Sequence, residues 1–178
     1  MTTASKITMA RVALVPVFIV LAILELDYIA LAVFIVAAAT DWIDGHVARK
    51  YNQISTFGKF VDPLADKLLV IAALLIFVER GQMPAWACFI VVAREFAVSG
   101  LRLVAMENGT VIAAGTSGKI KTASSLICAC IMLLPLHSFQ ILPWLSVDVL
   151  CVAVIVITTV YSGIEYFAVN KNAMDLSK

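Results

Sequence analysis

The sequence has 178 residues, of which 62% are hydrophobic and 14% are charged, and its net charge is +1. Its mean hydropathy of +1.01 is far above that of a soluble domain, so we expect a protein that is integral to the cell membrane. We expect no nucleic-acid partner for a chain of this composition. A membrane-spanning helix needs about 20 residues, so the chain has room for about six spans within a single domain over residues 1–178.

Six apolar runs follow one another along the chain. They cover residues 7–26, 28–40, 68–78, 83–93, 124–137 and 145–168. The second, third and fourth runs are too short to span a membrane, so each must continue through a charged neighbour, at 41–51, 57–67 and 94–102 respectively. This pattern predicts an all-α integral membrane protein built as a bundle of six transmembrane helices.

The charged residues have a one-sided distribution in such a bundle. If the helices run up and down, 12 of the 13 lysines and arginines fall on one side of the membrane and Arg80 alone falls on the other. The positive-inside rule makes the first side cytoplasmic and places both termini there. Ionisable groups within spans usually face a cavity, so we expect a polar cavity, containing the active site, that is open to the cytoplasm.

The charged ends of the second and third predicted helices carry four aspartates. Residues 41–67 read DWIDGHVARKYNQISTFGKFVDPLADK. Helical positions three and four apart share a face, so Asp41 and Asp44 form one stripe while Asp62 and Asp66 form another. The short loop between the helices makes the two stripes face each other. Converging carboxylates need a compensating charge, and oxygen ligands without His or Cys favour Mg²⁺ or Mn²⁺.

Small residues share the faces of these acids. Gly45 and Ala48 lie on the first stripe and Gly58 lies on the second. Small residues can serve close helix packing, or they can leave space for a ligand that carries phosphate. Because these three are interleaved with four acids, we favour the ligand.

The polar skeleton of this stretch is D-x2-D-G-x2-A-R-x8-G-x3-D-x3-D. It matches the signature of the CDP-alcohol phosphotransferase family at every fixed position, and the chain resembles that family over essentially its whole length. The resemblance implies that Asp41, Asp44, Asp62 and Asp66 hold the metal, and that Asp66 is also the catalytic general base. It further implies a homodimer and contacts between the CDP group and four residues. These are Gly45, Ala48, Arg49 and Gly58.

A basic block follows at residues 94–122, which read REFAVSGLRLVAMENGTVIAAGTSGKIKT. Its bases at the inner helix ends are Arg94, Arg102, Lys119 and Lys121. The positive-inside rule by itself explains such residues, and Lys119 and Lys121 are two apart, so they cannot point the same way. Arg94, however, adjoins a membrane-embedded run and needs an anionic partner, either Glu95 or a substrate phosphate.

Together with SGIEYF at 162–167 and SKITMARVALVPVF near the N-terminus, this block resembles the phosphatidylglycerophosphate synthase branch of the family. That branch transfers the phosphatidyl group of CDP-diacylglycerol, a membrane lipid, to sn-glycerol 3-phosphate. The resemblance implies that the acceptor's phosphate is bound by Arg94, Arg102, Lys119 and Lys121. Thr8 and Arg11 match the branch's N-terminal motif and are further candidates, whereas Ser5 stands where the branch usually has asparagine.

Two other functions fit parts of the sequence. A family member with another acceptor, such as inositol phosphate or serine, would keep the 41–66 skeleton and change the basic block. A cation transporter or channel could use the aspartates as an ion site. The acids lie at one end of the predicted spans rather than near their middle, which favours the enzyme.

Overall fold

The computed structural model describes residues 3–51, 56–107, 115–134, 140–142 and 145–170, with side chains described for 9–40, 67–105, 115–134 and 146–170. In these residues the chain forms six α-helices and one small β-hairpin. The elements are α1 (Thr3–Ile23), α2 (Asp27–Tyr51), α3 (Thr56–Glu79), α4 (Ala85–Glu107), α5 (Thr116–Leu133), β1 (Gln140–Leu142), β2 (Leu145–Ser146) and α6 (Val147–Val169).

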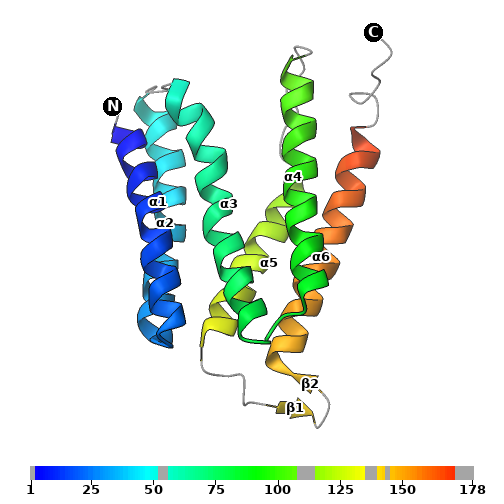
Figure 1. The fold of residues 1–178 in the computed structure, drawn as a ribbon. Helices are drawn as coiled ribbons and strands as arrows, with labels where there is room; N and C mark the ends of the chain where they lie inside the picture. Colours follow the sequence, from blue (N-terminus) through cyan, green and yellow to red (C-terminus); the bar gives the residue numbers. More distant parts are fainter. Residues whose placement is uncertain (1–2, 52–55, 108–114, 135–139, 143–144, 171–178) are drawn as a thin grey trace.

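The helices run alternately up and down, so that α1 begins and α6 ends at the same end of the molecule (Figure 1). Helix α1 packs against α2 and α3, while α6 packs against α4 and α5. Contacts of α5 with α2 and α3, and of α3 with α4, join the two groups. The helices therefore form one bundle, and the helical fold confirms that part of the prediction.

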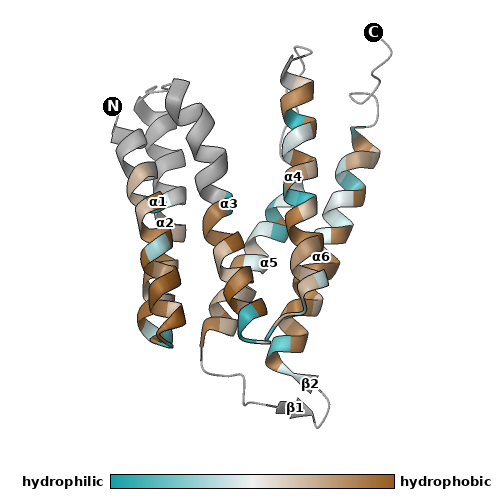
Figure 2. Cartoon of the chain, in the orientation of Figure 1, coloured by the Kyte–Doolittle hydropathy of each residue, from teal (hydrophilic) through white to brown (hydrophobic). Residues whose placement is uncertain are grey.

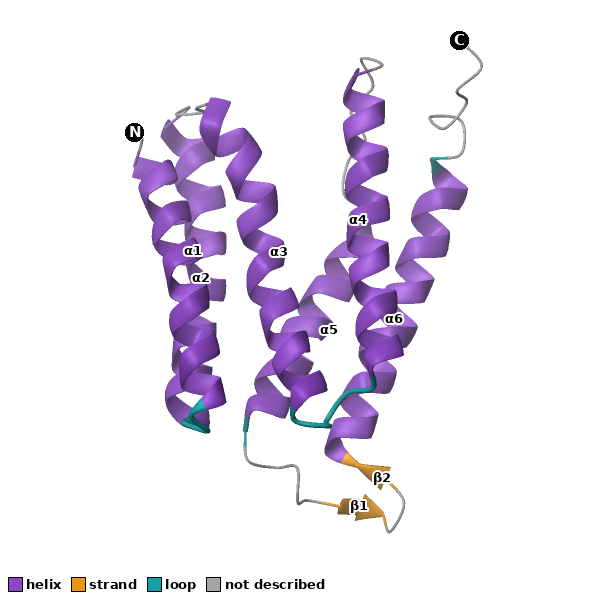
Figure 3. Ribbon diagram, in the orientation of Figure 1, coloured by secondary structure: helices purple, strands orange, loops and turns teal. Residues whose placement is uncertain are grey.

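The predicted helix extensions are also present. Helices α2, α3 and α4 each continue through the charged stretch that follows or precedes the apolar run. Helix α5 begins at Thr116, ahead of the apolar run at 124–137, so it includes Lys119 and Lys121 at its polar end as predicted. The antiparallel β1–β2 hairpin between α5 and α6 was not predicted (Figure 3). It pairs backbone groups that no helix satisfies.

The two turns at the opposite end of the bundle are tied together. Glu25 and Gly81 have positive φ angles of 57° and 71° and reverse the chain after α1 and α3. Between these turns, Arg80 Nη2 donates to Asp27 Oδ1 at 2.7 Å and to the carbonyl oxygen of Ala22 at 2.5 Å. Both side chains of the ion pair are mostly buried, so the pair fixes α3 against the α1–α2 turn.

The core combines aromatic side chains with many alanines. Phe18 of α1 and Phe34 of α2 are fully buried, with ring centroids 5.5 Å apart, and Phe77 of α3 lies in the same core. Small residues let helix backbones approach closely, which is typical of packing between membrane helices. The buried alanines include Ala22, Ala30, Ala37, Ala72, Ala73 and Ala87.

The outer surface of the bundle is apolar. Phe89 on α4 is 72% exposed, and Ile157 and Ile164 on α6 are each 67% exposed. Hydrophobic colour covers much of the described length of the helices (Figure 2). Within the described residues, α6 is long and apolar enough to cross a membrane, and shorter apolar segments cover Met9–Ile23 and Asp27–Thr40. So wide an apolar surface marks a membrane-associated protein.

Candidate functional site

A cavity of about 680 Å³ lies among α1, α2, α3, α4 and α5. This volume is within the range of roughly 300–1,000 Å³ that ligand pockets occupy. Apolar side chains such as Val70, Val91 and Leu126 form part of its wall. Its polar lining is mainly cationic, and the described bases that line it are Arg11, Lys67, Arg94, Arg102, Lys119 and Lys121. All four bases of the predicted acceptor site thus border one cavity, together with Arg11.

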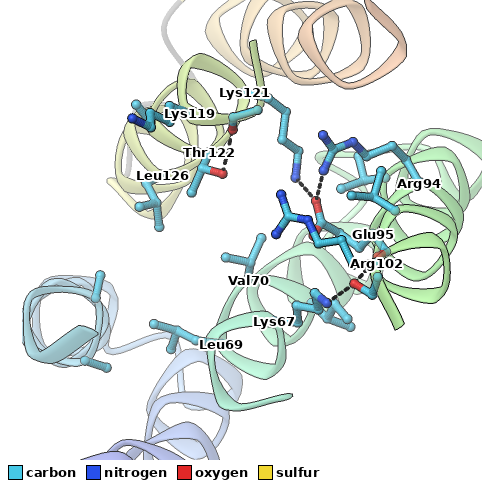
Figure 4. A pocket seen from close by; sticks show the side chains of 18 of the residues that line it. Lys67, Leu69, Val70, Arg94, Glu95, Arg102, Lys119, Lys121, Thr122 and Leu126 are labelled. Atoms are coloured by element: carbon cyan, nitrogen blue, oxygen red, sulfur yellow. Dashed lines mark hydrogen bonds and ion pairs between the residues drawn. The ribbon is translucent and has the colours of Figure 1, made fainter. Parts of the chain in front are cut away.

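Glu95 lies among these cationic side chains. It is the one acidic residue among the described residues that line the cavity. Its Oε1 accepts from Lys121 Nζ at 2.5 Å and from Arg94 Nη1 at 3.1 Å (Figure 4). In this structure Arg94 is paired with Glu95, one of the two partners that the sequence left open.

Lys121 and Lys119 differ in environment. Lys121 is 3% exposed and reaches from α5 to Glu95 on α4. Lys119 is exposed at the rim of the cavity and lies on a different side of α5 (Figure 4). The divergence follows from their spacing, because residues two apart on a helix do not share a face.

Arg94 passes between α5 and α6 through space left by two glycines. A Cβ atom on Gly118 would lie 3.7 Å from Arg94 Nη2, and a Cβ atom on Gly163 would lie 3.4 Å from Arg94 Cγ. The Nε atom of Arg94 is buried and has no hydrogen-bond partner among the described residues. At these distances a methyl group at either glycine would make van der Waals contact with the arginine.

Arg102 is held by an aromatic residue near the end of α6. Its Nε donates to the hydroxyl of Tyr166 at 3.1 Å, and its guanidinium carbon lies 5.5 Å from the centre of that ring. Tyr166 is 7% exposed and packs with Val98 and Leu101 of α4. The residue belongs to the SGIEYF motif, whose resemblance to the synthase branch predicted no particular contact for Tyr166.

Lys67 is a cavity residue that the sequence did not single out. Its ammonium group donates to Ser99 Oγ, and this hydroxyl donates in turn to the carbonyl oxygen of Glu95 at 2.7 Å. Lys67 directly follows Asp66 on α3. That adjacency to a predicted metal ligand was the signal that could have found it.

Arg11 connects α1 with the beginning of the aspartate motif. It is 2% exposed, and its Nε donates to Thr40 Oγ1 at 3.4 Å. Thr40 donates to the carbonyl oxygen of Ala37 at 2.6 Å and immediately precedes Asp41 in α2. The side chain of Thr8, the other N-terminal candidate, lies outside the described residues.

The predicted metal and CDP residues lie on α2 and α3, but their side chains are outside the described part of the chain. The backbone places Asp41 and Asp44 in α2 and places Asp62 and Asp66 in α3, and these two helices are in contact. The helical spacing that the stripes require is thus present. The predicted CDP contacts on the same two helices are Gly45, Ala48, Arg49 and Gly58.

The described side chains do not themselves provide a metal site. No group of three or more His, Cys, Asp or Glu within the described ranges could hold a metal ion. The predicted donor set for a hard cation, the four aspartates of α2 and α3, has its side chains outside these ranges and stays a prediction. Four carboxylates at helical spacing fit Mg²⁺ or Mn²⁺ in the chemistry of their oxygen atoms.

Comparison with known proteins gives consistent matches over nearly the whole chain. The chain is 44% identical to the CDP-diacylglycerol–glycerol-3-phosphate 3-phosphatidyltransferase of Bacillus subtilis, over 97% of each protein. It is 34% identical to the Haemophilus influenzae protein of that name, over 94% of the chain and 92% of the relative. A probable phosphatidylglycerophosphate synthase of Mycobacterium tuberculosis is 35% identical over 93% of the chain and 79% of its own length. Residues 1–169 match the model of the CDP-alcohol phosphatidyltransferase family, and the chain belongs to that family.

Proposed function

We propose that this chain is a CDP-diacylglycerol–glycerol-3-phosphate 3-phosphatidyltransferase, which converts CDP-diacylglycerol and sn-glycerol 3-phosphate into phosphatidylglycerophosphate and CMP. Relatives that carry this name cover nearly all of the chain. The observation that carries the proposal is the cavity, whose described lining holds six cationic side chains and the single carboxylate of Glu95. Such a lining suits an acceptor that bears a phosphate rather than a neutral acceptor.

The membrane arrangement is proposed on the surface of the bundle. Every helix exposes large apolar side chains, among them Val20 of α1, Val36 of α2, Leu75 of α3 and Ile127 of α5. We infer that all six helices cross the membrane as a single domain. Both termini and the opening of the cavity would then be cytoplasmic, because Arg80 is the one base at the opposite end of the described bundle.

The acceptor's phosphate is assigned to Arg94, Arg102, Lys119 and Lys121, with Arg11 and Thr8 as further candidates. Arg102 and Arg94 reach the cavity from α4, and Lys121 reaches it from α5. Arginine presents several N–H groups in a planar fork that matches the oxygens of a phosphate. These side chains would orient glycerol 3-phosphate with its attacking hydroxyl toward the aspartates.

The aspartates of α2 and α3 are assigned to the donor. Asp41, Asp44, Asp62 and Asp66 would hold Mg²⁺ or Mn²⁺, in agreement with the use of divalent metal ions by this family. When bound, such an ion neutralises the diphosphate and stabilises CMP as the leaving group. The CDP group would lie against Gly45, Ala48, Arg49 and Gly58.

Asp66 is assigned the role of general base. Its carboxylate would accept the proton of the attacking glycerol hydroxyl. The hydroxyl oxygen forms a bond to the phosphorus that carries diacylglycerol, and the bond from that phosphorus to the CMP oxygen breaks. The protein supplies position and electrostatics for this displacement, without a covalent intermediate. Family resemblance also leads us to expect a homodimer, which crosslinking in detergent would test.

The decisive experiment is CMP release by the purified protein in detergent. CDP-diacylglycerol and Mg²⁺ or Mn²⁺ would be combined with glycerol 3-phosphate, inositol phosphate, inositol or serine in turn. We expect release with glycerol 3-phosphate alone. Release with another acceptor would overturn the acceptor assignment, and no release with any acceptor would favour an ion-transport role for the acidic cluster.

A further inference from the structure

The carboxylate of Glu95 occupies a position that suits an anionic oxygen of a ligand. A single atom, Oε1, accepts from Arg94 of the same helix and from Lys121 of α5. Two of the cations assigned to the acceptor's phosphate are therefore already bound to one oxygen of the protein. A phosphate that enters the cavity must either share these cations with Glu95 or take them from it.

The charge balance of the cavity makes this competition strong. Lys121 is almost fully buried, and an isolated ammonium group in such a place is costly. Glu95 removes part of this cost before the acceptor binds. The carboxylate also repels a phosphate that approaches the same two cations, because like charges only a few ångströms apart interact unfavourably.

Glu95 is linked to a third cation through its backbone. Its carbonyl oxygen accepts from the Ser99 hydroxyl, which accepts from Lys67. Three bases from three helices, α3, α4 and α5, thus converge on this one residue. If the Glu95–Lys121 pair served only to join α4 and α5, it would not need to line a cationic cavity.

We propose that Glu95 is an exchangeable counter-ion of the acceptor site, which holds Arg94 and Lys121 in place and gives them up to the acceptor's phosphate. This inference rests on the proposed function. Glu95 is then a positioning residue that lowers the affinity for phosphate. The moderate affinity lets the phosphorylated product leave the cavity, since the product retains the acceptor's phosphate.

The first test is Glu95→Gln, which keeps the size and the hydrogen-bond acceptor but removes the charge. We expect the KM for glycerol 3-phosphate and the inhibition constant of inorganic phosphate to fall together, by about threefold to tenfold. The KM for CDP-diacylglycerol should not change, and kcat should stay within about threefold. Glu79→Gln is the matched control. It makes the same substitution at an exposed glutamate, the last residue of α3, which does not line the cavity.

A second test covers the case in which Glu95→Gln does not fold. Lys121→Gln leaves Glu95 without its closest cation, so the acceptor's KM should rise. Adding Glu95→Gln to this variant removes the repelling carboxylate and should lower that KM again. A merely structural ion pair predicts that Lys121→Gln impairs the constants of both substrates through loss of stability, because it leaves the charge of Glu95 buried without a partner. The counter-ion role predicts that the KM for the acceptor alone rises and then falls, while the KM for CDP-diacylglycerol stays unchanged.

The outcomes separate this inference from the proposed function. Wild-type protein that releases no CMP with glycerol 3-phosphate would overturn the proposed function. If the wild-type protein is active but folded Glu95→Gln has an unchanged or raised KM for glycerol 3-phosphate and an unchanged or raised inhibition constant for phosphate, the counter-ion role alone is overturned. A double variant whose KM for the acceptor is no lower than that of Lys121→Gln would also overturn the counter-ion role.

Discussion

Replacing Arg102 with alanine should weaken acceptor binding much more than donor binding. The guanidinium of Arg102 lines the cavity from α4, whereas the residues assigned to CDP lie on α2 and α3. The substitution removes one full positive charge from the acceptor side. It should leave the helix intact, because alanine is a good helix former.

The magnitude follows from the charges in the cavity. A unit charge about 4 Å from a phosphate contributes about 4 kcal/mol at an effective dielectric constant of about 20. Displacing water from the arginine and the phosphate and fixing the long side chain offset part of this energy, so we expect about half of this value. A loss of about 2 kcal/mol corresponds to an increase of about 30-fold in the KM for glycerol 3-phosphate.

Tyr166→Phe tests the same part of the site with a smaller change than Arg102→Ala. It removes the hydroxyl that accepts from Arg102 Nε at 3.1 Å and keeps the ring that lies 5.5 Å from the guanidinium carbon. One hydrogen bond has a net value of about 1 kcal/mol, so the acceptor's KM should rise by about fivefold. CMP release at varied glycerol 3-phosphate, and then at varied CDP-diacylglycerol, measures both constants.

Two results would contradict this reasoning. If Arg102→Ala raises the KM of both substrates equally, the arginine supports the structure rather than the acceptor. If Tyr166→Phe costs as much as Arg102→Ala, the tyrosine hydroxyl contacts the acceptor itself.

Three further predictions test the rest of the site and the fold. Asp66→Asn should lower kcat at least about 100-fold and largely spare CDP-diacylglycerol binding, because a base is lost while three carboxylates remain; near-normal turnover would disprove the base assignment. EDTA should abolish CMP release and added Mg²⁺ or Mn²⁺ should restore it, whereas full activity in EDTA would exclude the metal. Asp27→Asn breaks the pair with Arg80 and should lower the apparent Tm in detergent by about 2–4 °C with unchanged KM values; an unchanged Tm would show that the pair is dispensable.

Much of the fold could be predicted from local sequence. Apolar runs that were too short to span predicted that α2, α3 and α4 extend through charged residues, and the structure confirms these extensions. The prediction was made because a helix that spans a membrane needs about 20 residues. The hairpin at β1 and β2 was missed because strands of three and two residues are too short to show a periodic pattern.

The sequence also predicted which residues carry the chemistry. Fixed helical spacing sets which aspartates of α2 and α3 share a face, and charge placement sets the end of the bundle at which the bases gather. These are properties of single helices, so they can be read without knowing the neighbours. The aspartate side chains lie outside the described residues, and their metal site stays a prediction.

Only the tertiary structure decided which residues meet. Lys121 pairs with Glu95 across 26 positions, Lys67 contacts Ser99 across 32, and Arg102 contacts Tyr166 across 64. Such contacts depend on how each helix is rotated and which helices are neighbours. Apolar helix surfaces resemble one another and do not encode this order locally. The sequence named Glu95 as one of two possible partners of Arg94. Its contact with Lys121 and its place in the lining of the cationic cavity emerged only from packing.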